Sequence, residues 1–370
     1  MLSRRDFLRN VAMGAVAAAV VPSWAADEPA PTEEPAGFAG PLPRRGIHVM
    51  AGGASSVPAL ERLVGEIAPS LGLNWVILEV DAGFQFASHP ECAESDPVTK
   101  EDARKLAALA RDKDIQLVPQ YQCLGHQSWK ENVGALLRAH PEFNEAPEMD
   151  TTAEGFYCMS WCPNHPDLNA IVFDLFDELI DAFEAKAFHV GMDEVFVLGQ
   201  CPRCRGKSNA ELFAKAVNDL HGHLVGERGV EMQMWGDRLL NEEVMHYDGW
   251  DNSNNGTWEA VDSVPKDIVM CDWHYGMSNP GFPSVRFFQD KGFRVWPSGW
   301  NSERSIRRFI EVARKESGPL MLGYLCTTWT DVTPLVKGLA GEPVESEGRH
   351  LGRVVSGVKL GAQLARGEDA

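Results

Sequence analysis

The feature that most constrains the fold of this chain is a regular alternation, from Arg45 onward, of short apolar runs and longer segments with helical periodicity. The apolar runs are rich in Val, Ile and Leu and largely lack polar alternation, which is typical of parallel strands buried on both faces. Strands that alternate with helices predict βαβ units and a parallel sheet. Eight runs have this character: Ile47–Ala51, Asn74–Val80, Gln116–Tyr121, Phe188–Met192, Glu231–Trp235, Ile268–Trp273, Phe293–Trp296 and Met321–Thr327.

The intervening segments and the number of strands favour a closed barrel. Thr99-Lys-Glu-Asp102 has the form of a capping box at the start of a helix, and Pro166–Ala185 and Ser208–Arg228 repeat apolar residues at helical spacing. Eight strands in one alternating series favour a (β/α)8 TIM barrel over an open doubly wound sheet. The Gly52-Gly53 pair after the first run lacks the spacing of a dinucleotide-binding loop. We therefore expect a single catalytic barrel domain over residues 44–366.

The N-terminal segment has the marks of an export signal. Ser3-Arg4-Arg5-Asp6-Phe7-Leu8 is a twin-arginine pattern, an apolar run follows from Val11 to Val21, and Ser23-Trp24-Ala25 places small residues where a signal peptidase cuts. These patterns predict a twin-arginine signal peptide over residues 1–25 and a disordered leader, rich in Pro, Glu and Ala, over residues 26–43. The apolar run is too short to span a bilayer. We expect an exported protein, periplasmic or extracellular, with no membrane span after maturation.

Charge and motif content exclude several classes of partner. The formal net charge of −19 argues against nucleic acid and against an anionic membrane surface, because both require clustered Lys and Arg. No His-Glu-x-x-His or comparable ligand set is present in the sequence. We therefore expect no catalytic metal and no cofactor.

The eight cysteines leave two structural interpretations open. In an exported protein, disulfides or free thiols are favoured. Cys201-Pro-Arg-Cys204 instead resembles half of a zinc site, for which Cys158 and Cys162 form the other close pair. The spacing alone favours thiols or disulfides over zinc and does not give the connectivity.

Acidic and aromatic residues recur where the predicted strands end. In a barrel of this kind the active site lies at the carboxyl ends of the strands. A sugar ring packs its apolar face on aromatic rings and binds charged groups through its hydroxyls, and glycosidic cleavage needs a carboxylic acid to protonate the leaving oxygen. The pattern therefore indicates a glycosidase, with these candidate residues at the strand ends: Asp81, Gln122, His126, Asp193, Glu194, Trp235, Asp237, Trp273, Trp300, Trp329 and Asp331.

Asp193 and Glu194 are adjacent, which raises a geometric question. Neighbours in a regular strand point to opposite faces, so both can serve one pocket only if the strand breaks there. Gly191 makes such a break easy. A solvated turn is the alternative, but the surrounding pattern His189-x-Gly-x-Asp-Glu-Val-x-x-Leu-Gly199 favours a functional pair.

The chain resembles glycoside hydrolase family 20, the β-N-acetylhexosaminidases, and within it the hexosaminidase D-like branch. The specific match is Phe188–Gly199, which contains the His-x-Gly-x-Asp-Glu motif of the family. The resemblance covers the barrel from Arg45 to Pro334 and is looser outside that motif. The looser matches are Gly72–Glu79 with Phe84 and Phe86, Val118–His126, Arg45-Gly46 and Trp329-Thr-Asp331.

The resemblance implies an exo-acting, retaining hydrolase that removes terminal β-linked N-acetylhexosamine by substrate-assisted catalysis. Glu194 would be the general acid and then the base, and Asp193 would orient the acetamido group and stabilise the oxazolinium ion. Arg45 and Asp331 would bind sugar hydroxyls. Trp235, Trp273 and Trp329 would wall the pocket, and His126 and His189 would either support the acids or be structural histidines.

The chain departs from the family pattern in three places. Gln120 stands where many members have an acid, and Phe293–Trp300 lacks the tyrosine that the seventh strand usually supplies for the acetamido group. Too few residues lie between the predicted cleavage point and Arg45 for the small domain that usually precedes the barrel. These departures leave two alternatives open: a barrel glycosidase with a different sugar preference, and a glycan-binding protein that has lost activity.

Overall fold

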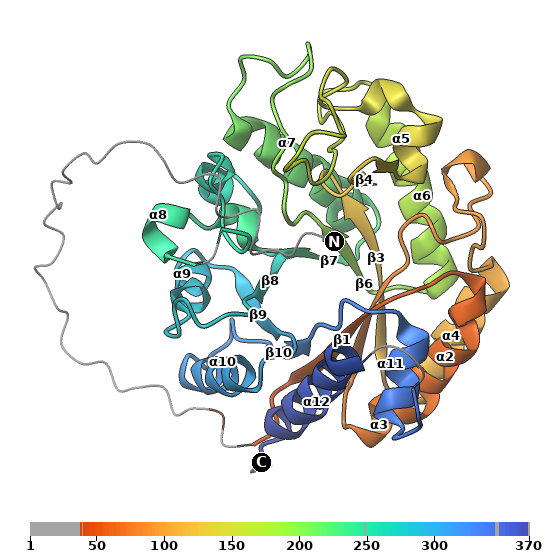
Figure 1. Ribbon diagram of the computed structural model, residues 1–370, viewed down its shortest axis with the longest axis vertical. Coiled ribbons are helices and arrows are strands. Elements are labelled where there is room, and N and C mark those ends of the chain that lie inside the picture. The colour runs from red at the N-terminus through yellow and green to blue at the C-terminus, as the bar shows by residue number, and fades with distance from the viewer. Residues whose placement is uncertain (1–37, 39, 248, 345–347, 369–370) are drawn as a thin grey trace, which may run out of the picture.

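In the computed structural model eight parallel strands close into a barrel, and helices surround it (Figure 1). The structure describes residue 38 and residues 40–247, 249–344 and 348–368. Around the barrel the strands follow the order β1, β2, β3, β6, β7, β8, β9, β10. The predicted TIM barrel is confirmed, and each predicted strand is present: β1 (Arg44–Met50), β2 (Trp75–Glu79), β3 (Gln116–Cys123), β6 (Ala187–Gly191), β7 (Glu231–Trp235), β8 (Val269–Trp273), β9 (Arg294–Gly299) and β10 (Gly323–Cys326).

Helices cover the outside of the barrel, and their ends follow local sequence signals. At the start of α4 the Thr99 side chain accepts the backbone N–H of Asp102, whose carboxylate accepts the N–H of Thr99, so the predicted capping box is confirmed. Ser208 and Glu211 cap α7 in the same way. The helices are α2 (Val57–Arg62), α3 (Ala68–Ser70), α4 (Lys100–Asp112), α5 (Ala135–Ala139), α6 (Leu168–Phe183), α7 (Asn209–His221), α8 (Glu242–Met245), α9 (Pro283–Asp290), α10 (Glu303–Lys315), α11 (Val332–Leu339) and α12 (Gly348–Ala365).

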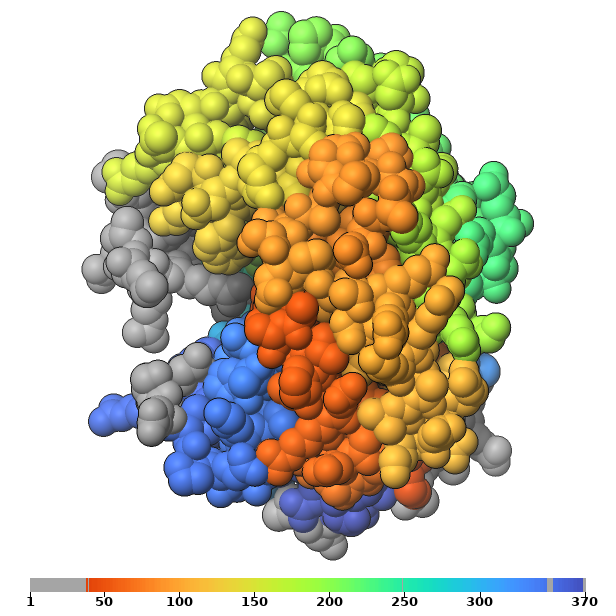
Figure 2. Space-filling model, turned by 90° about the vertical axis from the view of Figure 1, so that its right-hand side faces the viewer, coloured from red at the N-terminus to blue at the C-terminus, as the bar shows by residue number. Residues whose placement is uncertain are grey.

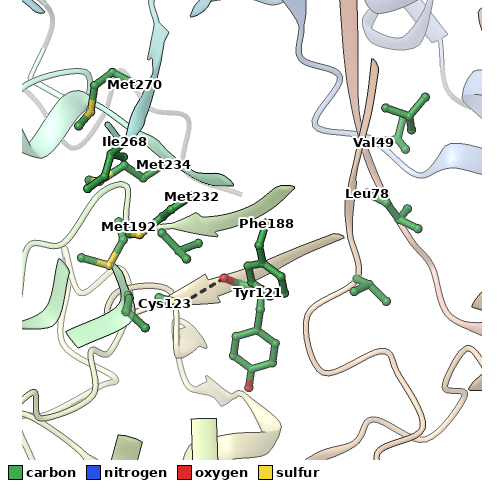
Figure 3. Packing of buried hydrophobic residues seen from close by; sticks show 14 of the residues in the cluster. Val49, Leu78, Tyr121, Cys123, Phe188, Met192, Met232, Met234, Ile268 and Met270 are labelled. Carbon is green, nitrogen blue, oxygen red and sulfur yellow. Dashed lines mark hydrogen bonds between the residues drawn. The ribbon is translucent and has the colours of Figure 1, made fainter. Parts of the chain in front are cut away.

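Two apolar layers stabilise the barrel, one on each face of the sheet. Side chains that point outward from the strands pack against the helices, and Figure 3 shows Phe188, Met232 and Met234 of this outer layer. The alternate side chains fill the barrel, among them Trp235 and Trp296, which are fully buried. The interior is therefore a packed core that supports whatever lies at the rim.

Charged residues close the amino-terminal end of the barrel. Glu231, at the start of β7, pairs with Arg44 at the start of β1 (2.7 Å) and with Arg294 at the start of β9 (2.5 Å). Leu42, in the segment predicted to be a disordered leader, is fully buried, and its N–H donates to the Ala365 carbonyl at the end of α12. At Leu42 the structure therefore departs from the predicted disorder, because this side chain packs in the apolar core and its backbone bonds the end of α12. The predicted signal peptide over residues 1–25 lies outside the described residues.

Two long loops rise at the carboxyl-terminal end of the barrel and shape its rim. The β3 loop (residues 124–167) carries α5 and a short hairpin of β4 (Ser128–Trp129) and β5 (Asn132–Val133). It forms the yellow region at the top of Figure 2, above the orange N-terminal segments. The β6 loop (residues 192–208) runs from the end of β6 to α7. Within the described residues, no helix has the length and apolar character needed to cross a bilayer.

Candidate active site

The chain leaves the regular strand geometry at the end of β6. Gly191, Met192 and Glu194 have positive φ angles of 66°, 74° and 50°. A side chain at Gly191 would also collide with the amide of Gln122. Because the strand breaks here, Asp193 and Glu194 both face one cavity, as the sequence predicted from Gly191.

That cavity, which we call the central pocket, has a volume of about 600 Å³. It lies over the carboxyl ends of the strands, where TIM-barrel enzymes build their active sites. The residues that line it come from the strand ends and from the β3 loop. They are Met50, Glu79, Asp81, Glu94, Gln122, His126, Ser128, Trp129, Asn132, Val133, Gly134, Arg138, Tyr157, Asp193, Glu194, Trp273, Tyr275 and Trp329.

Asp193 is held as a carboxylate by two neighbours. His126 Nε2 lies 3.4 Å from Asp193 Oδ2, and the Gln122 amide donates to Asp193 Oδ1. Burial alone would raise the pKa of Asp193, but His126 and Gln122 lower it below its usual value. Asp193 is therefore ionised at neutral pH.

His126 bridges the two acids of the pair. Its Nε2 also lies 3.4 Å from Glu194 Oε2. Burial alone would lower the pKa of this imidazole, but Asp193 and Glu194 together hold it well above its usual value. A protonated His126 stabilises the Asp193 carboxylate in the buried pocket that the two acids share.

Tyr157, on the β3 loop, contacts the other acid directly. Its hydroxyl donates to Glu194 Oε2 at 2.6 Å. Burial, followed by the nearby Glu194, raises the pKa of Tyr157, so the phenol keeps its proton. Its ring lies edge-on against Trp129 and Trp250, with centroids 5.2 and 4.9 Å away. The β3 loop thus completes the environment of Glu194.

Asp237 was predicted to bind substrate, and the structure corrects this. It is buried behind the pocket wall, where its carboxylate accepts the Glu194 backbone N–H (3.0 Å) and the Trp273 indole N–H (3.2 Å). Arg238 Nε donates to the same carboxylate at 2.7 Å. Burial raises the pKa of Asp237 to about 6 against the opposing effect of Arg238. Asp237 therefore positions Glu194 and Trp273 and lies outside the pocket lining.

Aromatic rings form one wall of the central pocket. Trp273 and Trp329 line it as predicted, with Tyr275 between them. The Trp329 indole N–H donates to the Tyr275 hydroxyl at 2.6 Å. Two further predicted tryptophans lie behind this wall. Trp235 points into the barrel core below the pocket, and Trp300 packs behind Tyr275 with its N–H bonded to the Thr328 carbonyl.

The acids at the end of β2 form the opposite side of the pocket. Asp81 lines the pocket as predicted, and its Oδ1 accepts the Gln122 backbone N–H at 2.7 Å. Burial and the neighbouring Glu79 raise the pKa of Asp81 well above its usual value. Gln120 donates from its amide to Glu79 Oε2 at 2.8 Å. An acid at position 120 would repel Glu79, so the amide found there suits this chain.

Three other predicted residues have structural roles. Asp331 is exposed and caps α11 by accepting the Thr333 N–H at 2.9 Å. His189 is fully buried in the barrel core, where burial, followed by His48, lowers its pKa. Arg45 lies at the amino-terminal end of β1, away from the rim, and donates to the carbonyls of Gly72 (2.7 Å) and Leu42 (2.6 Å). These three roles depend on the direction in which each side chain points and on the end of the strand at which the residue lies. Residue type alone reveals neither.

The Arg45→Ala variant is expected to lose about 1.5 kcal/mol of unfolding free energy, because two hydrogen bonds from a charged donor disappear. Urea denaturation measures this loss. Arg104→Ala, on the exposed side of α4, is the matched control and should change the unfolding free energy by less than about 0.5 kcal/mol. A variant of unchanged stability that binds sugar less tightly would contradict this placement of Arg45.

The sequence did not single out several residues that line the pocket. Tyr275 comes two residues after the strand-end residue Trp273 and could have been found by extending the search past the end of β8. Tyr157, Arg138 and Trp129 lie on the β3 loop, whose helix and strands are too short to show a periodicity from which their direction could be read. Arg138 pairs with Glu94 at 2.8 Å and is the arginine of the described pocket lining, in place of Arg45.

Comparison with known proteins gives a consistent match. The sequence profile described as Glycosyl hydrolase family 20, catalytic domain, matches residues 81–335. A beta-hexosaminidase of Akkermansia muciniphila is 30% identical over 256 residues, which cover 64% of this chain and 49% of the relative. A beta-hexosaminidase of Vibrio furnissii is 25% identical over 180 residues, 47% of this chain and 26% of the relative. The chain thus spans half the length or less of these curated relatives.

Solved structures share the fold. An exo beta-N-acetylglucosaminidase from Vibrio harveyi, solved with N-acetylglucosamine, superposes with a TM-score of 0.60 at 16% identity, covering 87% of this chain and 54% of the other. A beta-N-acetylhexosaminidase from Bacteroides fragilis gives 0.58 at 15% identity, covering 86% and 66%. At such identities the likeness concerns the fold, and the chemistry must be argued from the pocket.

Proposed function

The chain belongs to glycosyl hydrolase family 20, and we propose that it is an exo-acting, retaining glycosidase that removes terminal β-linked N-acetylhexosamine from glycans. The observation that carries this proposal is the pair Asp193 and Glu194 in one pocket, the first held ionised and the second bonded to Tyr157. The placement in the hexosaminidase D-like branch stays a prediction.

The first step forms a bond within the substrate. The carbonyl oxygen of the 2-acetamido group attacks the anomeric carbon, the glycosidic bond breaks, and Glu194 donates its proton to the leaving oxygen. The product of this step is an oxazolinium ion. Asp193 accepts a hydrogen bond from the acetamido N–H and stabilises the positive charge that develops on the ring.

The second step returns the site to its starting state. Glu194, now a carboxylate, takes a proton from water as that water attacks the anomeric carbon. The bond to the acetamido oxygen breaks, so the acetamido group is restored and Glu194 is again protonated. Two inversions at one carbon give net retention. Tyr157 holds the Glu194 carboxyl in position through both steps.

The aromatic wall is suited to hold the terminal sugar. Trp273 and Trp329 offer apolar faces for the ring, and Tyr275 presents a hydroxyl beside them. We propose that this hydroxyl supplies the acetamido contact that a seventh-strand tyrosine makes in the family pattern. Tyr275 follows β8, the sixth strand of the barrel, so the same group would reach the pocket from a neighbouring strand.

The stereochemistry of the first-formed product tests the mechanism. Proton NMR of the reaction with an aryl N-acetyl-β-glucosaminide should show the β-anomer of the free sugar before mutarotation produces the α-anomer. Initial release of the α-anomer would mean direct displacement by water and would exclude the acetamido route.

Tyr157→Phe is expected to lower kcat/KM by roughly tenfold, because it removes the hydrogen bond that positions the Glu194 carboxyl, a contribution of about 1.5 kcal/mol. Steady-state kinetics measures the change. Tyr247→Phe is the matched control, since the Tyr247 hydroxyl bonds Ser284 and lies outside the pocket lining. If the two variants had the same kcat/KM, Tyr157 would have no role in the reaction.

We also propose export by the twin-arginine route to the periplasm or the medium. Ser3-Arg4-Arg5-Asp6-Phe7-Leu8 and the apolar run after it support this proposal. Replacement of Arg4 and Arg5 by Lys, followed by cell fractionation, tests it: retention of the unprocessed variant in the cytoplasm is expected, and normal export would contradict it.

A further inference from the structure

A second cluster of reactive side chains lies outside the central pocket, where the β3 loop meets the β6 loop. It contains Glu145 and Cys162 from the β3 loop and Cys201 and Cys204 from the β6 loop, and all four are buried. Cys162 Sγ lies 3.3 Å from Cys201 Sγ and 3.5 Å from Cys204 Sγ. One ligand atom from each residue lies within 4.8 Å of the others.

The distances match a tetrahedral metal centre. Sulfur atoms bound to one Zn²⁺ at about 2.3 Å lie about 3.8 Å apart, so an outward shift of a few tenths of an ångström would admit the ion. A disulfide would bring two sulfurs to about 2.05 Å and would leave the third cysteine and the glutamate without a role. All eight cysteines lie within the described residues and are free thiols.

Glu145 supplies an independent observation. Its side chain is fully buried, and Oε1 accepts the Gln200 backbone N–H at 3.1 Å. Among the described residues Oε2 has no hydrogen-bond partner. A buried carboxylate oxygen without a partner is costly, and a cation between Glu145 and the three sulfurs would satisfy it.

The backbone around Cys201 and Cys204 forms two consecutive turns. Cys204 N–H donates to the Cys201 carbonyl, Lys207 N–H donates to the Cys204 carbonyl, and Gly206 has a φ of 86°. The Asn164 amide also donates to Cys204 Sγ at 3.3 Å. A thiol that binds Zn²⁺ loses its proton, so the ion would hold the buried Cys204 as a thiolate.

We propose that Cys162, Cys201, Cys204 and Glu145 bind one structural Zn²⁺. Binding releases the three thiol protons to solvent and fills all four coordination positions, which is the pattern of structural and not of catalytic zinc. The ion ties together the two loops that carry Tyr157 and Glu194. It therefore fixes the hydrogen bond between these residues without entering the pocket.

The sequence favoured thiols or disulfides and paired Cys201-x-x-Cys204 with Cys158 and Cys162. The fold separates that second pair. Cys158 Sγ lies 3.9 Å from the Glu194 carbonyl, next to the central pocket, whereas Cys162 joins the cluster. Glu145 takes the fourth position, and no spacing in the sequence indicated it.

Metal analysis of the purified full chain tests the proposal. One zinc per chain should survive dialysis. Cys204→Ser should retain less than a tenth of that zinc, and Cys326→Ala, a buried cysteine of β10 outside the cluster, should retain all of it. Absence of zinc from protein produced with zinc supplied would overturn the proposal. A disulfide that joins any two of Cys162, Cys201 and Cys204, found by mass spectrometry, would overturn it as well.

Cobalt substitution tests the metal site in the wild-type chain, so its result does not depend on whether Cys204→Ser folds. The wild-type chain loaded with Co²⁺ should show thiolate-to-cobalt charge-transfer absorption and the strong visible bands of a tetrahedral centre. Chelation of the zinc should lower Tm by on the order of 5–10 °C, and Glu145→Gln should weaken zinc binding by more than about tenfold in a chelator competition. A cobalt spectrum without thiolate bands, or a Tm indifferent to chelator, would contradict the site.

Discussion

Glu194→Gln is expected to reduce kcat/KM on a glycan substrate by about 10³- to 10⁴-fold, at the upper end of what general acid catalysis contributes. The amide keeps the shape of the side chain beside Tyr157 but has no proton to give to the leaving oxygen and cannot take one from water. For aryl glycosides the variant should reduce the rate of the first step less, because a phenolate leaves readily without protonation. Steady-state kinetics on both substrate types measures the difference.

Glu94→Gln is the matched control for this variant. Glu94 also lines the central pocket, but at the rim, where it pairs with Arg138. We expect it to change KM by a fewfold and to leave kcat nearly unchanged. If Glu194→Gln kept activity within tenfold of the wild type on glycans, Glu194 would not be the acid, and Asp193 would become the first residue to test for that role.

Asp193→Asn is expected to lower kcat/KM by about 10²- to 10³-fold on acetamido sugars, the usual effect of losing one oriented electrostatic contact to the transition state. The amide removes the negative charge that would face the oxazolinium ion. It also takes from His126 one of its two carboxyl neighbours, 3.4 Å away. The loss should fall mainly on kcat, because the contact matters most once positive charge has developed.

A stable cyclic analogue of the oxazolinium intermediate provides the second readout for Asp193→Asn. Its inhibition constant should rise by a similar factor, whereas the inhibition constant of the neutral sugar product should rise by less than tenfold. Equal weakening of both ligands would mean that Asp193 contributes only to ground-state sugar binding. That result would contradict a role in charge stabilisation.

The barrel could be predicted from sequence because its signals are local. Buried parallel strands such as Val76–Leu78 consist of consecutive apolar residues, and helix starts such as Thr99 carry side chains that cap their own backbone. The pairing of Asp193 with Glu194 was likewise local, because it depends on a strand break at Gly191 that glycine readily allows.

The other site assignments depended on direction and on distant contacts. Side chains of β7 alternate between the inside and the outside of the barrel, and Trp235 points inward to the core. Asp331 caps the start of α11. Tyr157 and Glu145 acquire their neighbours through the β3 loop, whose path is set by packing against the β6 loop. Such contacts join residues that are far apart in the chain, so spacing within one segment does not reveal them.

Comparing three substrates of the wild-type chain tests the substrate-assisted mechanism most directly. Aryl N-acetyl-β-glucosaminide, aryl N-acetyl-β-galactosaminide and plain aryl β-glucoside differ at the groups that the mechanism distinguishes. We expect hydrolysis of one or both acetamido sugars and at least about a thousandfold lower kcat/KM on the plain glucoside, which lacks the internal nucleophile. Comparable hydrolysis of the plain glucoside, or sugar binding without turnover of any of the three, would contradict this mechanism.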